Sequence, residues 1–228
     1  MTDPLHIAFL LFPNVTQLDL TGPAQFLSRV GRVSYVAATL DPVPTDAGFA
    51  IVPTATYADV PAADILCVPG GVGVTAVIDD DVAIAWVARV GAEARWVTSV
   101  CTGSLILGAA GLLRGYRATT HWAWHDHLAL FGASSVAART VVDGNRITGG
   151  GVTAGIDFAL TLIAEAVDEP MARIVQLALE YDPQPPFDSG SPHRVDPALR
   201  ATYDRRIARM YPNRAAELRA AALRCGFS

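Results

Sequence analysis

Short continuous runs of apolar residues alternate along the chain with longer segments in which apolar and polar residues recur at helical spacing. Four runs have the length expected of strands buried on both faces of a parallel sheet: residues 6–12, 33–39, 64–68 and 95–100. Clear helical patterns follow two of them, at residues 81–92 and 105–113. This alternation predicts an α/β fold, a single-domain doubly wound sandwich with a mostly parallel central sheet.

The segment after the first strand is harder to assign, because Gly22-Pro23 interrupts its helical spacing. We expect a short helical turn that contains Asp19, followed by a separate helix from about Pro23. Residues 42–56 are rich in Pro, Thr and Val and predict a hairpin or a small excursion from the sheet.

The second half of the chain continues the alternation. We expect a strand at residues 117–119, a helix at 121–130, a hairpin at 139–148 and a helix at 170–180. Thr153 is a good N-cap residue for a further helix over residues 154–165. The core domain is therefore placed at residues 1–181. A Pro-rich linker and an Arg-rich helical C-terminal extension occupy residues 182–228, and we expect the extension to wrap the body or a partner.

Composition narrows the possible chemistry. All 17 basic residues are Arg, so Schiff-base chemistry, pyridoxal phosphate attachment and the lysine-dependent phosphate-binding loop are excluded. The formal net charge of −5 gives no general attraction to nucleic acid or to anionic membranes, and neither partner is expected. Charged residues make up only 17% of the chain, which favours burial of surface against a second copy.

The three cysteines, Cys67, Cys101 and Cys225, are widely spaced and odd in number. This pattern argues against a secreted disulfide framework and against paired zinc ligands. The first six residues carry no basic segment, and the apolar run that follows is too short for a signal peptide or a membrane span. We therefore expect a cytoplasmic protein with reduced thiols. Cys67 is interpreted as a core residue and Cys225 as incidental.

Candidate reactive groups follow several predicted strands. Asp19 comes just after the first strand, Gly70-Gly71 after the third, Cys101-Thr102 after the fourth, and residues 149–151 after the hairpin. Loops at the carboxyl ends of strands meet at one edge of an open α/β sheet, where ligands bind. The sequence thus predicts one site built from these four loops, with Gly150 and Val152 among its substrate-binding residues.

Cys101 is the candidate nucleophile. The segment Ser99-Val100-Cys101-Thr102-Gly103 follows the small-x-nucleophile-x-small pattern of a nucleophile elbow, in which small flanking residues permit a sharp strand-to-helix turn. A helix N-terminus favours a thiolate, so we expect Cys101 to be more acidic than a free thiol. The alternative is a buried structural cysteine, the commoner role of an unpaired Cys.

The other site residues also have structural alternatives. The amides of Gly71 and Thr102 are candidates to donate to a developing negative charge, and Gly70 permits close backbone approach. Pro69-Gly70-Gly71 is equally typical of an ordinary turn, and residues 149–151 are equally typical of a plain loop. Asp19 is also a typical cap residue for the helix that follows it. A metal site at His121, His125 and His127 is disfavoured, because no suitable carboxylate ligand accompanies them.

Five motifs together resemble the PfpI and glutamine-amidotransferase-like superfamily over residues 5–181. They are Leu18-Asp19-Leu20-Thr21-Gly22-Pro23, Pro69-Gly70-Gly71, the segment 98–104 around Cys101, Ala118-Thr119-Thr120-His121-Trp122, and the segment 149–157. Asp19, Thr102 and the linker after residue 178 resemble the isonitrile hydratases within it. Intracellular peptidases of the superfamily usually carry His after the cysteine, where this chain has Thr102.

The resemblance implies a homodimer, a thiolate at Cys101, an oxyanion-binding pair near Gly71 and Thr102, and Asp19 as the acid near the sulfur. It further implies hydration of an isonitrile to an N-substituted formamide through a thioimidate on Cys101, with no metal or organic cofactor. One rival is a ligand-sensing domain, since related transcription regulators carry a similar cysteine region. Another is a glyoxalase-like or deglycase enzyme, which usually has Glu in place of Asp19.

Overall fold

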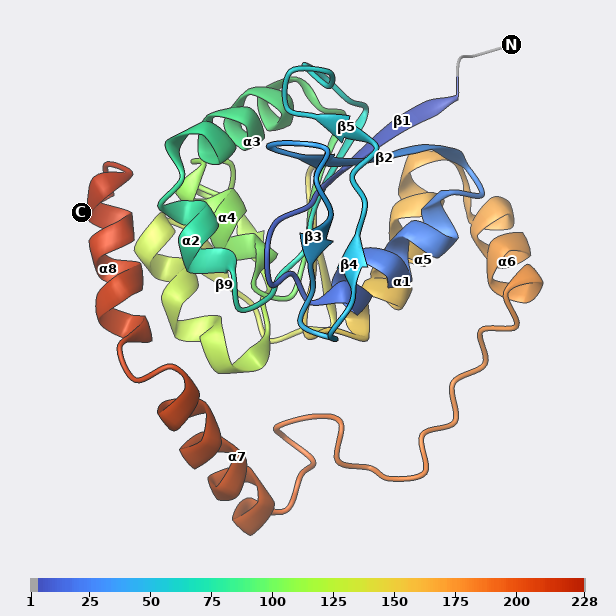
Figure 1. The fold of residues 1–228 in the computed structure, drawn as a ribbon. Coiled ribbons are helices and arrows are strands. Elements are labelled where there is room, and N and C mark those ends of the chain that lie inside the picture. The colour runs from blue at the N-terminus through green and yellow to red at the C-terminus, as the bar shows by residue number, and fades with distance from the viewer. Residues whose placement is uncertain (1–3, 228) are drawn as a thin grey trace.

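A computed structural model describes residues 4–227 and contains a central sheet of seven strands (Figure 1). In spatial order the strands are β10 (Thr140–Asp143), β11 (Arg146–Gly149), β7 (Trp96–Val100), β6 (Ile65–Val68), β1 (Leu5–Leu10), β2 (Gly31–Ala37) and β5 (Ala55–Thr56). Every neighbouring pair is parallel except the β10–β11 hairpin. The expected mostly parallel sheet is confirmed.

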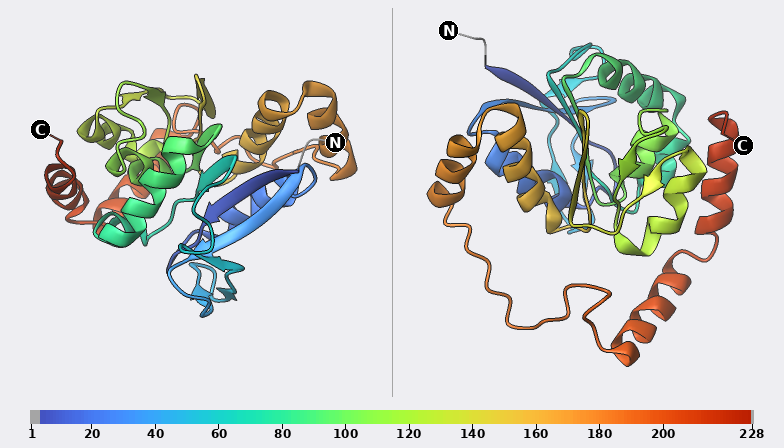
Figure 2. Two further views of the ribbon diagram at one scale, coloured as in Figure 1. Left: turned by 90° about the horizontal axis from the view of Figure 1, so that it is seen from above. Right: turned by 180° about the vertical axis from the view of Figure 1, so that it is seen from behind.

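Helices cover both faces of this sheet (Figures 1 and 2). One layer holds α1 (Gln17–Leu27), α5 (Ala154–Ala166) and α6 (Glu169–Ala178), which pack against one another. The other layer holds α2 (Val74–Ile78), α3 (Asp81–Glu93), α4 (Gly103–Ala109) and the 3₁₀ helix η1 (Trp122–Phe131). This arrangement is the doubly wound sandwich that the alternation of apolar runs and helical patterns predicted.

The apolar runs form the core because their strands are covered on both sides. All four residues of β6 are buried, and Ile7, Ala8 and Leu10 of β1 are fully inaccessible. Two small sheets lie outside the central one. The expected excursion after β2 is an antiparallel pair, β3 (Val43–Pro44) with β4 (Ala50–Ile51), and β8 (Arg117–Ala118) pairs with β9 (Ser134–Ser135).

Three local expectations were wrong. Residues 17–27 form one helix rather than a turn and a separate helix, with Pro23 inside it. The buried side chains of α1 pack this helix against α5, and tertiary packing outweighs the one hydrogen bond that Pro23 removes. Thr153 precedes α5 but makes no side-chain cap hydrogen bond. Residues 122–131 are 3₁₀ rather than α-helical, so His121 and His125 do not share an α-helical face.

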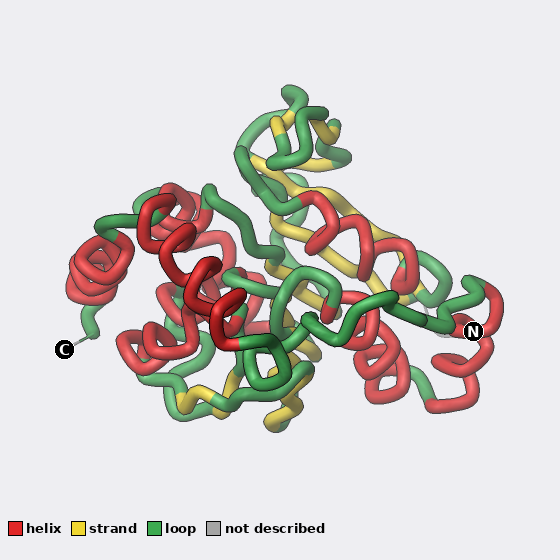
Figure 3. Tube along the Cα trace, turned by 90° about the horizontal axis from the view of Figure 1, so that it is seen from below, coloured by secondary structure: helices red, strands yellow, loops and turns green. Residues whose placement is uncertain are grey.

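The C-terminal extension comprises α7 (Pro197–Met210) and α8 (Arg214–Arg224), reached through a largely exposed linker (Figure 1). Helix α8 buries Leu218 and Ala221 and contacts η1 and α2, while Phe227 meets Phe131 edge to face at 5.6 Å between ring centres. Seen from below, α7 and the linker run in front of the body (Figure 3). No helix within residues 4–227 is long and apolar enough to cross a bilayer.

Candidate active site

Cys101 occupies a sharp turn between β7 and α4. Its φ of +55° lies in the left-handed region, which a non-glycine residue enters only when its surroundings enforce it. Its amide donates to the Gly150 carbonyl at 2.7 Å, and its carbonyl accepts from Thr120 Oγ1 at 3.0 Å. A Cβ at Gly103 would overlap the backbone of Val68. The turn is thus held in the strained geometry of a nucleophile elbow.

The loop Pro69-Gly70-Gly71 holds two side chains beside this cysteine. The Gly70 amide donates to Asp19 Oδ2 at 2.9 Å, and the Gly71 amide donates to Thr102 Oγ1 at 3.1 Å. A Cβ at Gly70 would lie 2.6 Å from Thr102 Oγ1 and 2.9 Å from Asp19 Oδ2. Only glycine fits there, so the loop, the carboxyl and the hydroxyl form one packed unit.

Asp19 lies in the first turn of α1 with no exposed surface, in direct contact with the Cys101 thiol. Burial raises the pKa of this carboxyl to about 7, although hydrogen bonds from Gly70 and Cys101 oppose the shift. Its second oxygen, Oδ1, has no N–H or O–H partner among residues 4–227. Asp19 therefore has one oxygen free and can gain or lose a proton near neutral pH.

The thiol of Cys101 is less acidic than the sequence predicted. Burial raises its pKa well above the ordinary value, and the neighbouring Asp19 carboxylate raises it further. The Thr102 amide and hydroxyl both act on the sulfur and lower the pKa, but by less. Helix α4 has only seven residues, and its N-terminus does not offset the loss of solvation. Burial and the neighbouring carboxylate thus favour the protonated thiol of Cys101 over its thiolate.

Gly71 acts on the Cys101 sulfur indirectly, through the Thr102 hydroxyl. Its amide, expected to donate to a developing negative charge, donates to Thr102 Oγ1 in this structure. Because that oxygen accepts from Gly71, its hydroxyl hydrogen is available to the sulfur. The Thr102 amide also faces the sulfur. A negative charge on Cys101 is therefore met by two donors from Thr102, one of them oriented by Gly71.

A cavity of about 630 Å³ lies beside the backbone neighbours of the elbow, although Cys101 and Asp19 are not among its lining residues. Gly150 and Val152, the expected substrate-binding residues, both line it. Thr120 and Gly150 connect the cavity with Cys101, because both hydrogen-bond to its backbone. Its outer side is formed by residues 190–194 of the linker. This volume falls within the usual range for small-molecule sites.

His121 and His125 line this cavity, and burial lowers the pKa of both. His121 Nδ1 accepts from the Ala123 amide at 3.2 Å, and burial lowers the pKa of His121 to about 4. His125 Nε2 lies 3.0 Å from the Thr120 carbonyl. Within the described residues no group of three or more His, Cys, Asp or Glu side chains is arranged to hold a metal ion.

Two functional candidates were missed by sequence reasoning. Tyr203 of α7 and Tyr211 just after it are close enough to Cys101 for the sulfur's charge to act on both phenol groups. The Arg-rich extension was expected to wrap the body or a partner, but no local pattern indicates that it reaches the elbow. Aromatic residues amid the arginines were the one available signal.

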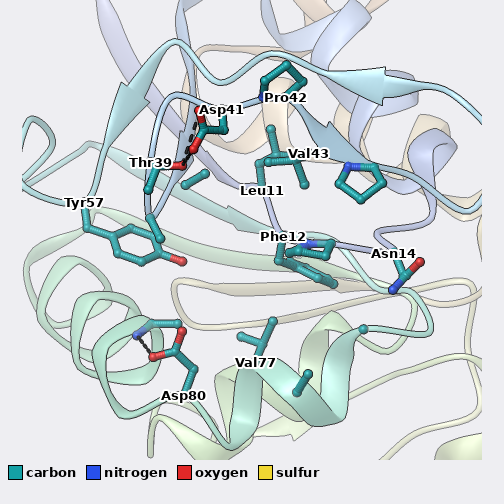
Figure 4. A pocket seen from close by; sticks show the side chains of 17 residues that line it. Leu11, Phe12, Asn14, Thr39, Asp41, Pro42, Val43, Tyr57, Val77 and Asp80 are labelled. Atoms are coloured by element: carbon teal, nitrogen blue, oxygen red, sulfur yellow. Dashed lines mark hydrogen bonds between the residues drawn. The ribbon is translucent and has the colours of Figure 1, made fainter.

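A second cavity, of about 460 Å³, lies between the β3–β4 hairpin and helices α2 and α3 (Figure 4). Phe12, Val43, Tyr57 and Val77 contribute side chains to it. None of the site residues predicted from the sequence lines it. The elbow and its adjoining cavity therefore form the candidate active site.

The chain was compared with known proteins and structures. Residues 5–165 match the model of the DJ-1/PfpI family. Isonitrile hydratase of Pseudomonas putida is 54% identical over 86% of this chain and 86% of its own. The crystal structure of a ThiJ/PfpI family protein from Pseudomonas syringae superposes with a TM-score of 0.91 at 45% identity, covering 97% of this chain and 91% of that one.

The transcriptional regulator GbdR of Pseudomonas aeruginosa is 31% identical over 79% of this chain, and the match spans 52% of the regulator. These findings confirm the resemblance drawn from the motifs around Asp19, Gly70 and Cys101. With its elbow cysteine, its buried acid and its doubly wound sheet, the chain belongs to the DJ-1/PfpI family.

Proposed function

We propose that this protein is an enzyme that hydrates isonitriles, R–N≡C, to N-substituted formamides, with Cys101 as nucleophile and Asp19 as acid and base. The observation that carries the proposal is the buried pair: the Asp19 carboxyl, with a pKa raised to about 7, lies against the Cys101 thiol. The 54% identity with an isonitrile hydratase supports this substrate class.

In the first step the Cys101 sulfur bonds to the terminal isonitrile carbon while Asp19 takes the thiol proton and delivers it to the same carbon. One C–S and one C–H bond form, the S–H bond breaks, and the product is the thioimidate R–N=CH–S–Cys101. The raised pKa of Cys101 suits this step, because the buried pair then holds the proton that the carbon needs. Thr102 donates to the sulfur as its proton leaves.

In the second step water attacks the thioimidate carbon. Asp19, now a carboxylate with Oδ1 free of protein donors, takes a proton from this water and passes it to the substrate nitrogen. The C–S bond then breaks, the hydroxyl proton of the intermediate passes to the Cys101 sulfur, and the formamide R–NH–CHO leaves. The sum is one isonitrile plus one water, so no other reactant is required.

The direct test is to incubate the purified protein with cyclohexyl isonitrile and follow formation of N-cyclohexylformamide. Catalytic turnover supports the hydratase. Stoichiometric binding without product would support the sensor instead, the candidate favoured by the match to GbdR over half of that regulator.

A glyoxalase-like or deglycase activity is the third candidate, since a deglycase of Pyrococcus horikoshii is 27% identical over 63% of this chain. The unpaired Oδ1 of Asp19 and the hydroxyl of Thr102 support a hydratase, because the attacking water needs a proton acceptor and the sulfur needs a donor as its proton leaves. Turnover of methylglyoxal but not of an isonitrile would reverse this choice.

We further infer that the enzyme acts in the cytoplasm as a homodimer. All three cysteines are free thiols, as expected in a reducing compartment. Helix α6 exposes Ile174 and Leu177 at 60% and 83% of their surface, an apolar face suited to a second copy. Light scattering should give twice the 24.1 kDa mass of one chain, and a monomer would contradict the dimer.

A further inference from the structure

The C-terminal extension packs aromatic rings against the wall of the candidate substrate cavity. Tyr203 contacts Trp122 with ring centres 5.2 Å apart, and Tyr211 meets Trp124 edge to face, also at 5.2 Å. His121 stacks on Trp122 at 5.6 Å. These five rings form a continuous cluster, called the aromatic wall below. It joins η1 to α7 through Trp122 and Tyr203, which are 81 residues apart in the sequence.

Two arginines of the extension fix the indole rings of this wall. The Arg200 guanidinium lies 4.2 Å from the centre of the Trp122 ring, and the Arg214 guanidinium lies 4.9 Å from that of Trp124. Both distances are within the range of cation–π attraction. Trp122 is therefore held by Arg200 and Tyr203, two residues of the same helix, α7, at i and i+3.

Trp122 and His121 also line the 630 Å³ cavity beside the elbow. Apolar surface from Val152, Ala137 and Pro192 faces the same space. The phenol of Tyr203 is close enough to the nucleophile that its pKa is raised by burial and further by the charge of Cys101. The aromatic wall thus joins the C-terminal extension to the lining of this cavity.

We propose that Trp122, held in place by Tyr203 and Arg200, is the surface that recognises the R group, so that the enzyme prefers isonitriles with a bulky cyclic R group to methyl isonitrile. This inference rests on the proposed isonitrile hydration. The reactive end of every isonitrile is the same, so discrimination comes from the R group, and the part of the indole that lines the cavity offers apolar contact that a methyl group is too small to use. Tyr203 is then a positioning residue.

The test compares three variants with the wild type. Tyr203→Ala removes the ring that supports Trp122, Tyr203→Phe keeps it, and Arg205→Ala alters an exposed residue on the opposite side of α7. The ratio of kcat/KM for cyclohexyl isonitrile to that for methyl isonitrile is measured for each. We expect Tyr203→Ala to reduce this ratio about tenfold, chiefly through KM for the cyclohexyl substrate, and the other two variants to retain it.

Binding separates this inference from the proposed function. Cys101→Ala binds without consuming the ligand, so calorimetry gives the dissociation constants of cyclohexyl and methyl isonitrile with and without Tyr203→Ala. A preference for the cyclohexyl compound that Tyr203→Ala abolishes supports the wall, even if the wild type shows no turnover and the hydratase proposal fails. An unchanged preference in Tyr203→Ala, or its loss in Arg205→Ala as well, would overturn the inference whether or not the enzyme hydrates isonitriles.

Discussion

A buried carboxyl with a raised pKa makes stability depend on pH in a definite direction. Asp19 ionises near 3.8 in an unfolded chain and near 7 in the folded protein, so between these values the folded state binds the extra proton. The contribution of Asp19 to the free energy of unfolding is therefore fully present below pH 3.8 and is lost as the pH rises through about 7. At about 1.4 kcal/mol per unit, the loss amounts to at most ~4 kcal/mol.

Asp19→Asn should reveal this contribution. Asparagine keeps an oxygen for the Gly70 amide and carries no charge, so we expect the variant to gain stability relative to the wild type as pH rises from about 5 to about 8. Turnover should fall at least about 100-fold, because the amide neither accepts nor delivers protons. Urea unfolding at several pH values checks the first expectation. A difference in stability that is independent of pH would show that the carboxyl is not buried with a raised pKa.

The same substitution tests the coupling between acid and thiol. The charge of Asp19 raises the pKa of Cys101, so its removal should shift iodoacetamide labelling of Cys101 to lower pH while turnover falls. Labelling of Cys225, which lies elsewhere, should not shift and serves as the control. Slower labelling of Cys101 in Asp19→Asn would mean that the carboxyl stabilises the thiolate instead.

At the residue scale, sequence indicates which side chains meet but not their acidity. Cys101 was identifiable from its small neighbours, and Asp19 from its place after a strand. The fall in acidity of Cys101 was not predictable, because it results from complete burial by segments distant in sequence. Tyr203 was missed for the same reason, since only the folded chain brings α7 to the elbow.

At the element scale, the Gly70 loop is the piece that aligns the site. A side chain there would collide with Thr102 and Asp19 at once, so Gly70→Ala should displace both and reduce turnover about 100-fold or more, with the fold retained. Gly22→Ala is the matched control. The Cβ added at Gly22 would lie 3.6 Å from Leu18 and Ile156, which is an ordinary contact distance. Activity should therefore persist, and helix α1 should become slightly more stable. Steady-state rates and circular dichroism for both variants check the prediction, and an active Gly70→Ala would contradict it.

The elements themselves were predictable to different degrees. Continuous apolar runs marked β1, β6 and β7, because a strand covered on both faces has no polar side. The continuity of α1 was not predictable, because Gly22-Pro23 is a local helix-breaking signal that packing against α5 overrides. The 3₁₀ form of η1 was not predicted from the sequence either, because the apolar periods of 3₁₀ and α-helices are hard to distinguish over ten residues.

At the scale of the whole molecule, the structure unites the C-terminal extension with the core. Leu218 of α8 is 1% exposed, whereas Leu223 of the same helix is 68% exposed. If α8 is docked in solution, Leu218→Ala should lower the free energy of unfolding by about 2–4 kcal/mol and Leu223→Ala by much less. Equal, small effects in denaturant unfolding would indicate a detached extension, which would also remove the support for the aromatic wall.

The boundary expected near residue 181 stays a prediction about sequence organisation. At this point the sequence changes from alternating apolar strands and helices to a Pro-rich linker, and this change is visible in the sequence itself. Whether α7 and α8 contact the body or a partner could not be decided from the sequence, because both helices carry many arginines. Helix α7 contacts η1 through aromatic and cation–π pairs, whereas α8 also buries Leu218 and Ala221.

The covalent step is the centre of this account, and intact-protein mass spectrometry tests it most directly. The wild-type protein, mixed with excess cyclohexyl isonitrile and quenched rapidly in acid, should gain the mass of one isonitrile molecule, and peptide mapping should place it on Cys101. Cys67→Ala and Cys225→Ala should form the adduct equally, and Cys101→Ala should form none. An adduct on another cysteine, or formamide production by Cys101→Ala at the wild-type rate, would contradict the proposed thioimidate.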